Sequence, residues 1–288
     1  MNMNSFRLPD STRIGYVHLR VSDLKQSLAF YRDLLGLKKV KRLDTTVRLS
    51  ASDEQSPIVM LTEESSARPR PLHSAGLFHA AFILPDRKEL AKMFKRLYDH
   101  QWPFEGFADH GVSEALYLAD PDGNGIEIYA DRPRAQWPRR HGELQMGTGE
   151  LDLKSLFSEL RENGEAWTGI HPDTTIGHIH LQVSNLQKAE LFYHQLLGFD
   201  VTQQTFPGAL FLSAGGYHHH IGLNIWNSKD GSPLAQDAVG LIRFGIEIPD
   251  RQTKSELKDR VVQSRYWNSA EGRQFLIRDE DNIAINIS

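Results

Sequence analysis

Three side chains in the first half of the sequence are of types that bind metal ions: His18, His79 and Glu127. Each stands out of phase with the apolar neighbours of a strand-like segment, so its side chain should leave the strand on the side away from the apolar face. Two imidazoles and one carboxylate, with coordination positions left open, form the ligand set suited to non-haem Fe(II). Mn, Ni or Zn could occupy the same set. We therefore predict one metal centre on these three residues.

A second group of candidate ligands stands in the other half of the sequence. His178 and His180 share one face of a predicted strand. Further along the chain, His218, His220 and Asn224 could join them. Together these residues could hold a second metal ion or an organic anion. The alternative, which we favour for catalysis, is a hydrogen-bonded hairpin that binds no ligand.

The strand that positions His18 occurs twice in the chain. The segment Ile14–Leu24 returns as Ile176–Leu186 in closely similar form, and both copies keep a histidine at the same place. A weaker echo inside each half relates Gly76–Arg87 to Gly240–Arg251. The chain therefore contains four related modules, two in each half.

Each module is predicted to fold as a strand, a helix and three further strands. Apolar and polar residues alternate from Tyr16 to Val21, which is the period of a strand. Asp23 then begins an amphipathic helix, and Gly36 is placed to end it. Such a module has one polar sheet face and cannot bury itself alone. We therefore expect an α+β fold in which four βαβββ modules pair into two domains with cupped eight-stranded sheets and the helices outside.

The repeat also predicts the domain organisation. We expect an N-terminal domain over residues 11–131 and a C-terminal domain over residues 174–288, each built from two modules. The metal site would lie in the first of them. Residues 132–173 form a connector that is rich in Pro, Arg and Gly in its first part and contains a short helix over residues 153–161.

Composition excludes several classes of function. The 288 residues carry a net charge of -4, which provides no basic field for nucleic acid. No long apolar run or charged, apolar leader is present, so we expect neither a membrane span nor a signal peptide. The chain has no cysteine, which removes disulfides and thiolate chemistry. A cytoplasmic enzyme fits these properties, with homo-oligomerisation left open.

These motifs together resemble a known superfamily. The strand with His18, the segment Phe30–Gly36 and the turn Asp120–Glu127 are similar to the vicinal oxygen chelate superfamily, whose members have the glyoxalase and extradiol dioxygenase fold. More narrowly, Asp109–Ser113 and Tyr117 resemble the catechol 2,3-dioxygenase group, in particular its bacterial two-domain members. The likeness extends over both halves.

The resemblance implies a function. It implies two domains of the glyoxalase/dioxygenase type and extradiol ring cleavage of a catechol-type aromatic diol by O2, in aromatic catabolism. Fe(II) would be held by His18, His79 and Glu127. His110 would relay a proton and Tyr117 would stabilise a developing oxyanion.

The sequence departs from the family pattern in its second half. Two-domain members usually keep their metal there, yet Arg243 stands where His79 stands in the first half, and Asn286 stands where Glu127 stands. An arginine cannot ligate a cation. The complete ligand set therefore belongs to the first half.

Two other functions remain open. A glyoxalase-like isomerase or lyase of this fold needs a fourth protein ligand, and Leu61 falls at that position, with Glu63 two residues on. A non-catalytic protein that binds an aromatic or antibiotic-like molecule would need no metal at all. The three candidate ligands argue against this second alternative.

Overall fold

The computed structural model describes residues 6–160, 167–271 and 274–288 and divides into two compact units. One unit contains the residues up to Leu19, Arg68–Phe78 and Gly177–Ser288. The other contains Arg20–Ala67 and His79–Ile176. The second unit therefore holds most of the first half of the chain.

The predicted module of a strand, a helix and three strands occurs four times, which confirms the α+β class. The first half contains β1 (Arg13–Val21), α1 (Leu24–Leu28) continued by the π-helical η1 (Ala29–Leu34), β2 (Lys38–Leu43), β3 (Thr46–Ser50), β4 (Val59–Glu63), β5 (Gly76–Leu84), α2 (Arg87–Asp99), β6 (Phe104–Asp109), β7 (Ser113–Ala119) and β8 (Gly125–Asp131). The second half contains β11 (Thr175–Gln182), α4 (Leu186–Glu190) continued by η3 (Leu191–Leu196), β12 (Asp200–Gln203), β13 (Ala209–Ser213), β14 (Ile221–Asn224), β15 (Gly240–Glu247), α5 (Arg251–Val262), β16 (Trp267–Glu271), β17 (Gln274–Arg278) and β18 (Ala284–Ile287).

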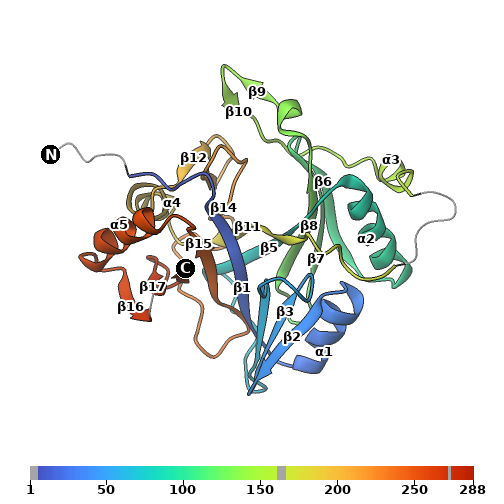
Figure 1. The fold of residues 1–288 in the computed structure, drawn as a ribbon, viewed down its shortest axis with the longest axis horizontal. Helices are drawn as coiled ribbons and strands as arrows, with labels where there is room; N and C mark the ends of the chain where they lie inside the picture. The colour runs from blue at the N-terminus through green and yellow to red at the C-terminus, as the bar shows by residue number, and fades with distance from the viewer. Residues whose placement is uncertain (1–5, 161–166, 272–273) are drawn as a thin grey trace. The chain divides into compact units, whose positions relative to one another are not determined.

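Local sequence explains where the helices begin and end. The Asp23 side chain accepts a hydrogen bond from the backbone N–H of Gln26, which caps α1. Gly36 follows η1 with a φ of 84°, a conformation that favours glycine. Apolar residues at helical spacing then bury one face of each helix. Figure 1 shows α1 and α2, which pack on β4 and β8 respectively.

The strands form two eight-stranded sheets, but their membership corrects one expectation. One sheet has the order β16-β17-β18-β15-β1-β4-β3-β2, and the other has the order β12-β13-β14-β11-β5-β8-β7-β6. Each sheet therefore combines one module from each half, whereas we expected both modules of one half to share a sheet. The four modules are so alike that their sequences do not specify which first strands pair.

Within each half, a buried tyrosine links one module to the next. The Tyr31 hydroxyl donates to Asp120 Oδ2 over 2.9 Å, and the Tyr193 hydroxyl donates to Asp279 Oδ2 over 2.9 Å. Both carboxylates lie in the turn before the last strand of a module and also accept backbone N–H groups. The repeat therefore preserves this hydrogen bond between modules as well as the order of elements.

The connector contains the predicted short helix in a shorter form. The helix α3 spans Leu153–Phe157 and buries Leu156, while residue 161 lies outside the described residues. Before it come η2 (Arg134–Gln136) and a hairpin of β9 (Arg139–Arg140) and β10 (Glu143–Leu144). In the described part of the chain, every helix is too short or too polar to span a bilayer. The domain bounds 11–131 and 174–288, the cytoplasmic location and the oligomeric state stay predictions.

Candidate metal centre

His79 and Glu127 lie on neighbouring parallel strands and meet as predicted. Ala81 of β5 is the register partner of Glu127 on β8, so Glu127 leaves the sheet on the same face as His79. The distance from His79 Nε2 to Glu127 Oε2 is 2.9 Å. The two residues are only 6% and 2% exposed. A carboxylate buried to this degree needs a positive partner.

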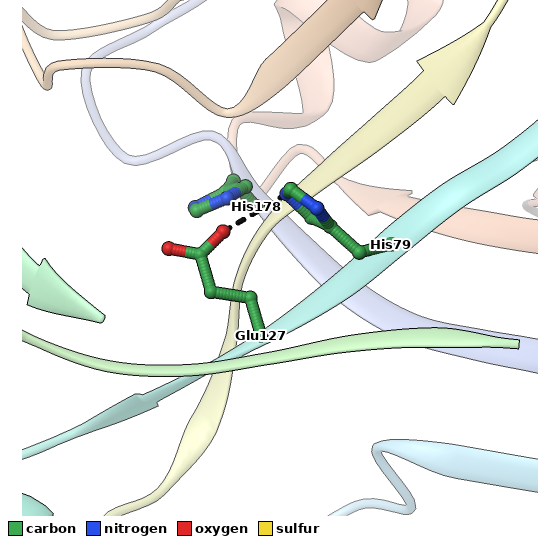
Figure 2. A group of neighbouring side chains, drawn as sticks. All are labelled: His79, Glu127 and His178. Carbon is green, nitrogen blue, oxygen red and sulfur yellow. Dashed lines mark ion pairs between the residues drawn. The ribbon is translucent and has the colours of Figure 1, made fainter. Parts of the chain in front are cut away.

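His178 supplies a third candidate ligand. One ligand atom each from His79, Glu127 and His178 lies within 4.8 Å of the other two (Figure 2). His178 is 1% exposed and lies on β11, next to β5 in the sheet order. Two imidazoles and a carboxylate are a donor set that fits a divalent transition metal.

The composition of this group differs from the predicted ligand set. His18 is also buried, but it lies on β1, which belongs to the other sheet, and the group does not include it. His178 appeared in the sequence only as a member of the second candidate set. The repeat aligns His18 with His180 and Tyr16 with His178, so the histidine kept in both copies is not the one that joins this group. The assignment of His18 as a ligand stays a prediction.

Tyr117 lies beside this group, as the sequence predicted. It is the register partner of Glu127 on β7, and its ring centroid is 5.6 Å from that of His79. Burial raises the pKa of Tyr117 well above its usual value, and the charge of Glu127 and a hydrogen bond to it raise the pKa further. The phenol therefore keeps its proton near neutral pH.

His110 is hydrogen-bonded to the same hydroxyl. His110 Nδ1 is 2.7 Å from the carbonyl oxygen of Gly147, which can only accept, so Nδ1 carries a proton. Its Nε2 is 2.7 Å from the Tyr117 hydroxyl, within hydrogen-bond distance. The family resemblance indicated both residues, but the sequence did not reveal the Gly147 carbonyl that orients the His110 ring.

The connector holds the loop that carries His110. Asp109 and Gly149 exchange two backbone hydrogen bonds of 3.0 and 2.8 Å. The Gly147 N–H donates to the His110 carbonyl over 3.3 Å. Arg132 adds an ion pair of 2.8 Å to Asp109. Three residues of the connector, Arg132, Gly147 and Gly149, therefore hold the loop in place.

The second candidate set surrounds His178 with imidazole and aromatic rings. The rings of His178 and His219 are 4.1 Å apart, and His218 Nδ1 is 2.8 Å from His219 Nδ1. Sequence reasoning missed His219, because alternation along a strand would place it on the other face. His220 Nδ1 accepts the backbone N–H of Ala214 over 3.2 Å. A second metal ion at these residues stays a prediction.

Strand register shows which residue replaces a fourth ligand. His180 is the register partner of Gly222 on β14, just as Ala81 is the partner of Glu127. The counterpart of Glu127 in this module is therefore Gly222, and Asn224 lies two residues beyond it. A Cβ added to Gly222 would lie 2.8 Å from Cγ of His180, so the histidine ring covers the position.

The two alternative ligands of a glyoxalase-type site have other roles. Leu61 is fully buried on β4, in the other sheet. Glu63 Oε1 accepts the backbone N–H of Leu24 over 3.0 Å and so stabilises the start of α1.

Comparison with known proteins places the chain in a family. The family model for the Glyoxalase/Bleomycin resistance protein/Dioxygenase superfamily matches residues 13–128 and 175–287. The chain belongs to this superfamily. Catechol-2,3-dioxygenase of Bacillus subtilis (strain 168) is 42% identical over 273 residues, which are 94% of each chain. Biphenyl-2,3-diol 1,2-dioxygenase 3 of Rhodococcus globerulus is 27% identical over 135 residues, which are 46% of this chain and 71% of that protein.

Solved structures of the superfamily share the fold. A Bacillus subtilis structure that is provisionally named a dioxygenase has a TM-score of 0.64 and 15% identity, and the match covers 96% of this chain and 84% of that one. Glyoxalase I from Zea mays has a TM-score of 0.58 and 15% identity, with 96% and 92% covered. These matches confirm the resemblance drawn from the sequence, and the B. subtilis relative confirms the expectation of a dioxygenase-type enzyme.

Proposed function

We propose that the chain is a metal-dependent extradiol dioxygenase that cleaves the ring of a catechol-type diol with O2. The observation that carries the proposal is the group of His79, Glu127 and His178, with the hydrogen-bonded pair of Tyr117 and His110 beside Glu127. The relationship to a catechol-2,3-dioxygenase over 94% of the chain supports the substrate class.

His79, Glu127 and His178 would hold the metal ion, with Fe(II) expected and Mn, Ni or Zn as alternatives. When bound, the ion would hold the two oxygens of the diol and activate O2. Its three protein ligands would leave positions for these molecules. Gly222 supports three protein ligands rather than four, because a glycine stands where the register would place a fourth ligand. A glyoxalase-type site with four protein ligands is disfavoured for the same reason.

Tyr117 and His110 would manage the proton that the diol releases. The raised pKa of Tyr117 keeps its hydroxyl protonated, so it can donate a hydrogen bond to a substrate oxygen as negative charge develops there. His110 Nε2 is 2.7 Å from the same hydroxyl and could exchange a proton with Tyr117. The Gly147 carbonyl accepts the Nδ1 proton and orients the ring toward Tyr117.

An aromatic wall near His180 fits an aromatic substrate. The ring centroids of Phe78, Trp226 and Phe211 lie 5.1, 5.6 and 5.7 Å from that of His180, in edge-on or tilted arrangements. His180 is on the same face of β11 as His178. A planar diol held by the metal would therefore meet aromatic side chains along this strand.

Metal loading and turnover test the proposal. The purified chain is depleted of metal, loaded anaerobically with Fe(II), and then given catechol and O2 while a yellow ring-cleavage product is followed. We expect one ion per chain and product formation that needs both iron and O2. A wild-type chain that binds no transition metal would refute the proposal.

Single substitutions identify the third ligand. His178→Ala should abolish iron binding, as should His79→Ala, whereas His18→Ala should keep one ion per chain. If His178→Ala kept its iron and His18→Ala lost it, His18 would be the third ligand, as first predicted. Our assignment of His178 would then be rejected.

A further inference from the structure

The eight-stranded sheet that contains β1, β15 and β18 has its own counterpart of the metal centre. On β15 and β18, Gly245 is the register partner of Asn286, just as Ala81 is the partner of Glu127. Arg243, two residues before Gly245, then corresponds to His79. On β1, the repeat aligns Tyr16 with His178. The three ligand positions are therefore occupied by a phenol, a guanidinium and a neutral amide, those of Tyr16, Arg243 and Asn286, in place of two imidazoles and a carboxylate.

Tyr16 lies close to the other two positions. A Cβ added to Gly245 would overlap the Tyr16 ring, so this ring lies directly on the backbone of β15 between the Arg243 and Glu247 positions. The amide Nδ2 of Asn286 donates to Gln274 Oε1 over 3.3 Å and has a second N–H to offer. An aromatic ring and an amide donor therefore share this face of the sheet with Arg243.

Arg243 itself is a half-buried cation without a counter-charge. Its Nε is buried and unpaired, and in the described part of the chain no hydrogen bond or ion pair engages its guanidinium. Glu247 shares its strand face, but that carboxylate is paired with Arg13 at 2.6 Å. Burying an unpaired charge is costly, whereas an arginine with five free donors matches the geometry of a carboxylate or phosphate.

We propose that this sheet binds a small oxyanion at Arg243, with Asn286 as a second donor and Tyr16 as an apolar neighbour. The ligand carries a carboxylate or a phosphate group. In this view the duplication produced two sites of opposite preference, one for a cation and one for an anion. The proposal is independent of the reaction at the metal centre.

Calorimetric titration with benzoate and with inorganic phosphate tests this site. The His79→Ala chain is used, so that neither anion can bind through a metal. We expect saturable binding of one anion per chain, and Arg243→Met should weaken it about ten-fold or more, as expected for loss of hydrogen bonds from a charged group. Arg251→Met, at an exposed position on α5, is the matched control and should leave binding unchanged.

The preferred anion identifies the ligand class. Tighter binding of benzoate indicates an organic carboxylate, and tighter binding of phosphate indicates a phosphate. Absence of saturable binding for both anions, or equal binding by Arg243→Met, would overturn the proposal. Thermal unfolding checks that this variant folds, and its midpoint in anion-free buffer should not fall, because the substitution removes an unpaired charge.

Discussion

Equivalent positions of the two eight-stranded sheets carry different functional groups. In the sheet that contains β5 and β8, the three positions supply imidazoles and a carboxylate, which bind cations. In the sheet that contains β15 and β18, they supply a phenol, a guanidinium and a neutral amide. The matched pairs are His178 with Tyr16, His79 with Arg243, and Glu127 with Asn286. The two sheets therefore share the same fold, whereas the side chains at these three positions differ.

Glu127→Gln places in the β5–β8 sheet the neutral amide that Asn286 supplies in the β15–β18 sheet. This substitution should have the largest effect. The variant loses the negative charge that balances the metal, and we expect iron affinity and turnover to fall by about 100-fold or more, since even partners of metal ligands contribute about 10- to 100-fold. Iron content and oxygen uptake measure both effects. Glu105→Gln, at an exposed position on β6, is the control. Unchanged iron content in Glu127→Gln would remove Glu127 from the ligand set.

Tyr117 has a counterpart that cannot move a proton. Leu276 is the register partner of Asn286, as Tyr117 is of Glu127. Tyr117→Leu should therefore make the first sheet resemble the second at this position as well. We expect kcat to fall by about 10²- to 10⁴-fold, the usual range for general acid–base groups, while the iron stays bound.

Tyr117→Phe separates the hydroxyl from the ring in the same assay. It should lose nearly as much kcat as Tyr117→Leu, since both variants lack the hydroxyl to which His110 is hydrogen-bonded. Tyr98→Phe, at an exposed position on α2, is the matched control. If Tyr117→Phe kept full turnover, Tyr117 would have only a packing role.

The modules were predictable because their signals are local. Period-2 alternation, the capping residue Asp23 and the terminating Gly36 depend only on nearby residues. The partnership of His79 and Glu127 was also predictable, since both stand out of phase within apolar strands. Tyr117 and His110 followed from the family resemblance, and the structure brings them within 2.7 Å of each other.

The pairing of modules was not predictable, and the third ligand depended on it. Any first strand of four similar modules could join any other, and only long-range packing selects β11 as the neighbour of β5. Once that pairing is known, His178 joins the group and His18 belongs to the other sheet. The same register replaces Asn224 by Gly222 as the counterpart of Glu127. The Gly147 carbonyl that orients His110 carries no signal in the sequence.

The turns before β8 and β18 offer a comparison of stability. Burial raises the pKa of Asp279 to about 7 from an ordinary value of 3.8. Burial also raises the pKa of Asp120, but there the Asn124 side chain donates to the carboxylate and opposes the shift. Ile283 stands at the corresponding place after Asp279 and offers only its backbone N–H. The second turn should therefore depend more strongly on pH.

Asp279→Asn should remove that dependence. Between pH 3.8 and about 7 the folded chain holds a proton on Asp279 that the unfolded chain has released. Its stabilising contribution is therefore complete below the lower value and is lost as the pH rises through the upper one. We expect the free energy of unfolding of Asp279→Asn, relative to wild type, to rise across this window by on the order of a few kcal/mol. Urea unfolding at several pH values measures it.

Asp120→Asn is the matched variant in the first half and should show the same trend with a smaller amplitude. Equal amplitudes in the two halves would mean that the Asn124 side chain does not distinguish the turns. A slope of opposite sign for Asp279→Asn would mean that its carboxylate is ionised in the folded chain.

The smallest expected effects concern the two glycines that lie under rings. Gly222 lies under His180 in one sheet, and Gly245 lies under Tyr16 in the other. An alanine at either place must displace the ring or the strand, at a cost of about 1–3 kcal/mol in stability. Gly106→Ala, on β6 with no atom within 4 Å of the added Cβ, is the control for both.

The two glycine variants should differ in ligand binding even if they lose the same stability. Gly222→Ala moves a ring that lines the proposed diol site and should raise KM for catechol. Gly245→Ala moves Tyr16 instead, so it should weaken benzoate binding at Arg243. Titration of each variant with both ligands tests this assignment. If each glycine affected both ligands equally, the two sheets would not hold separate sites, and the opposite preferences of their matched side chains would belong to one shared function.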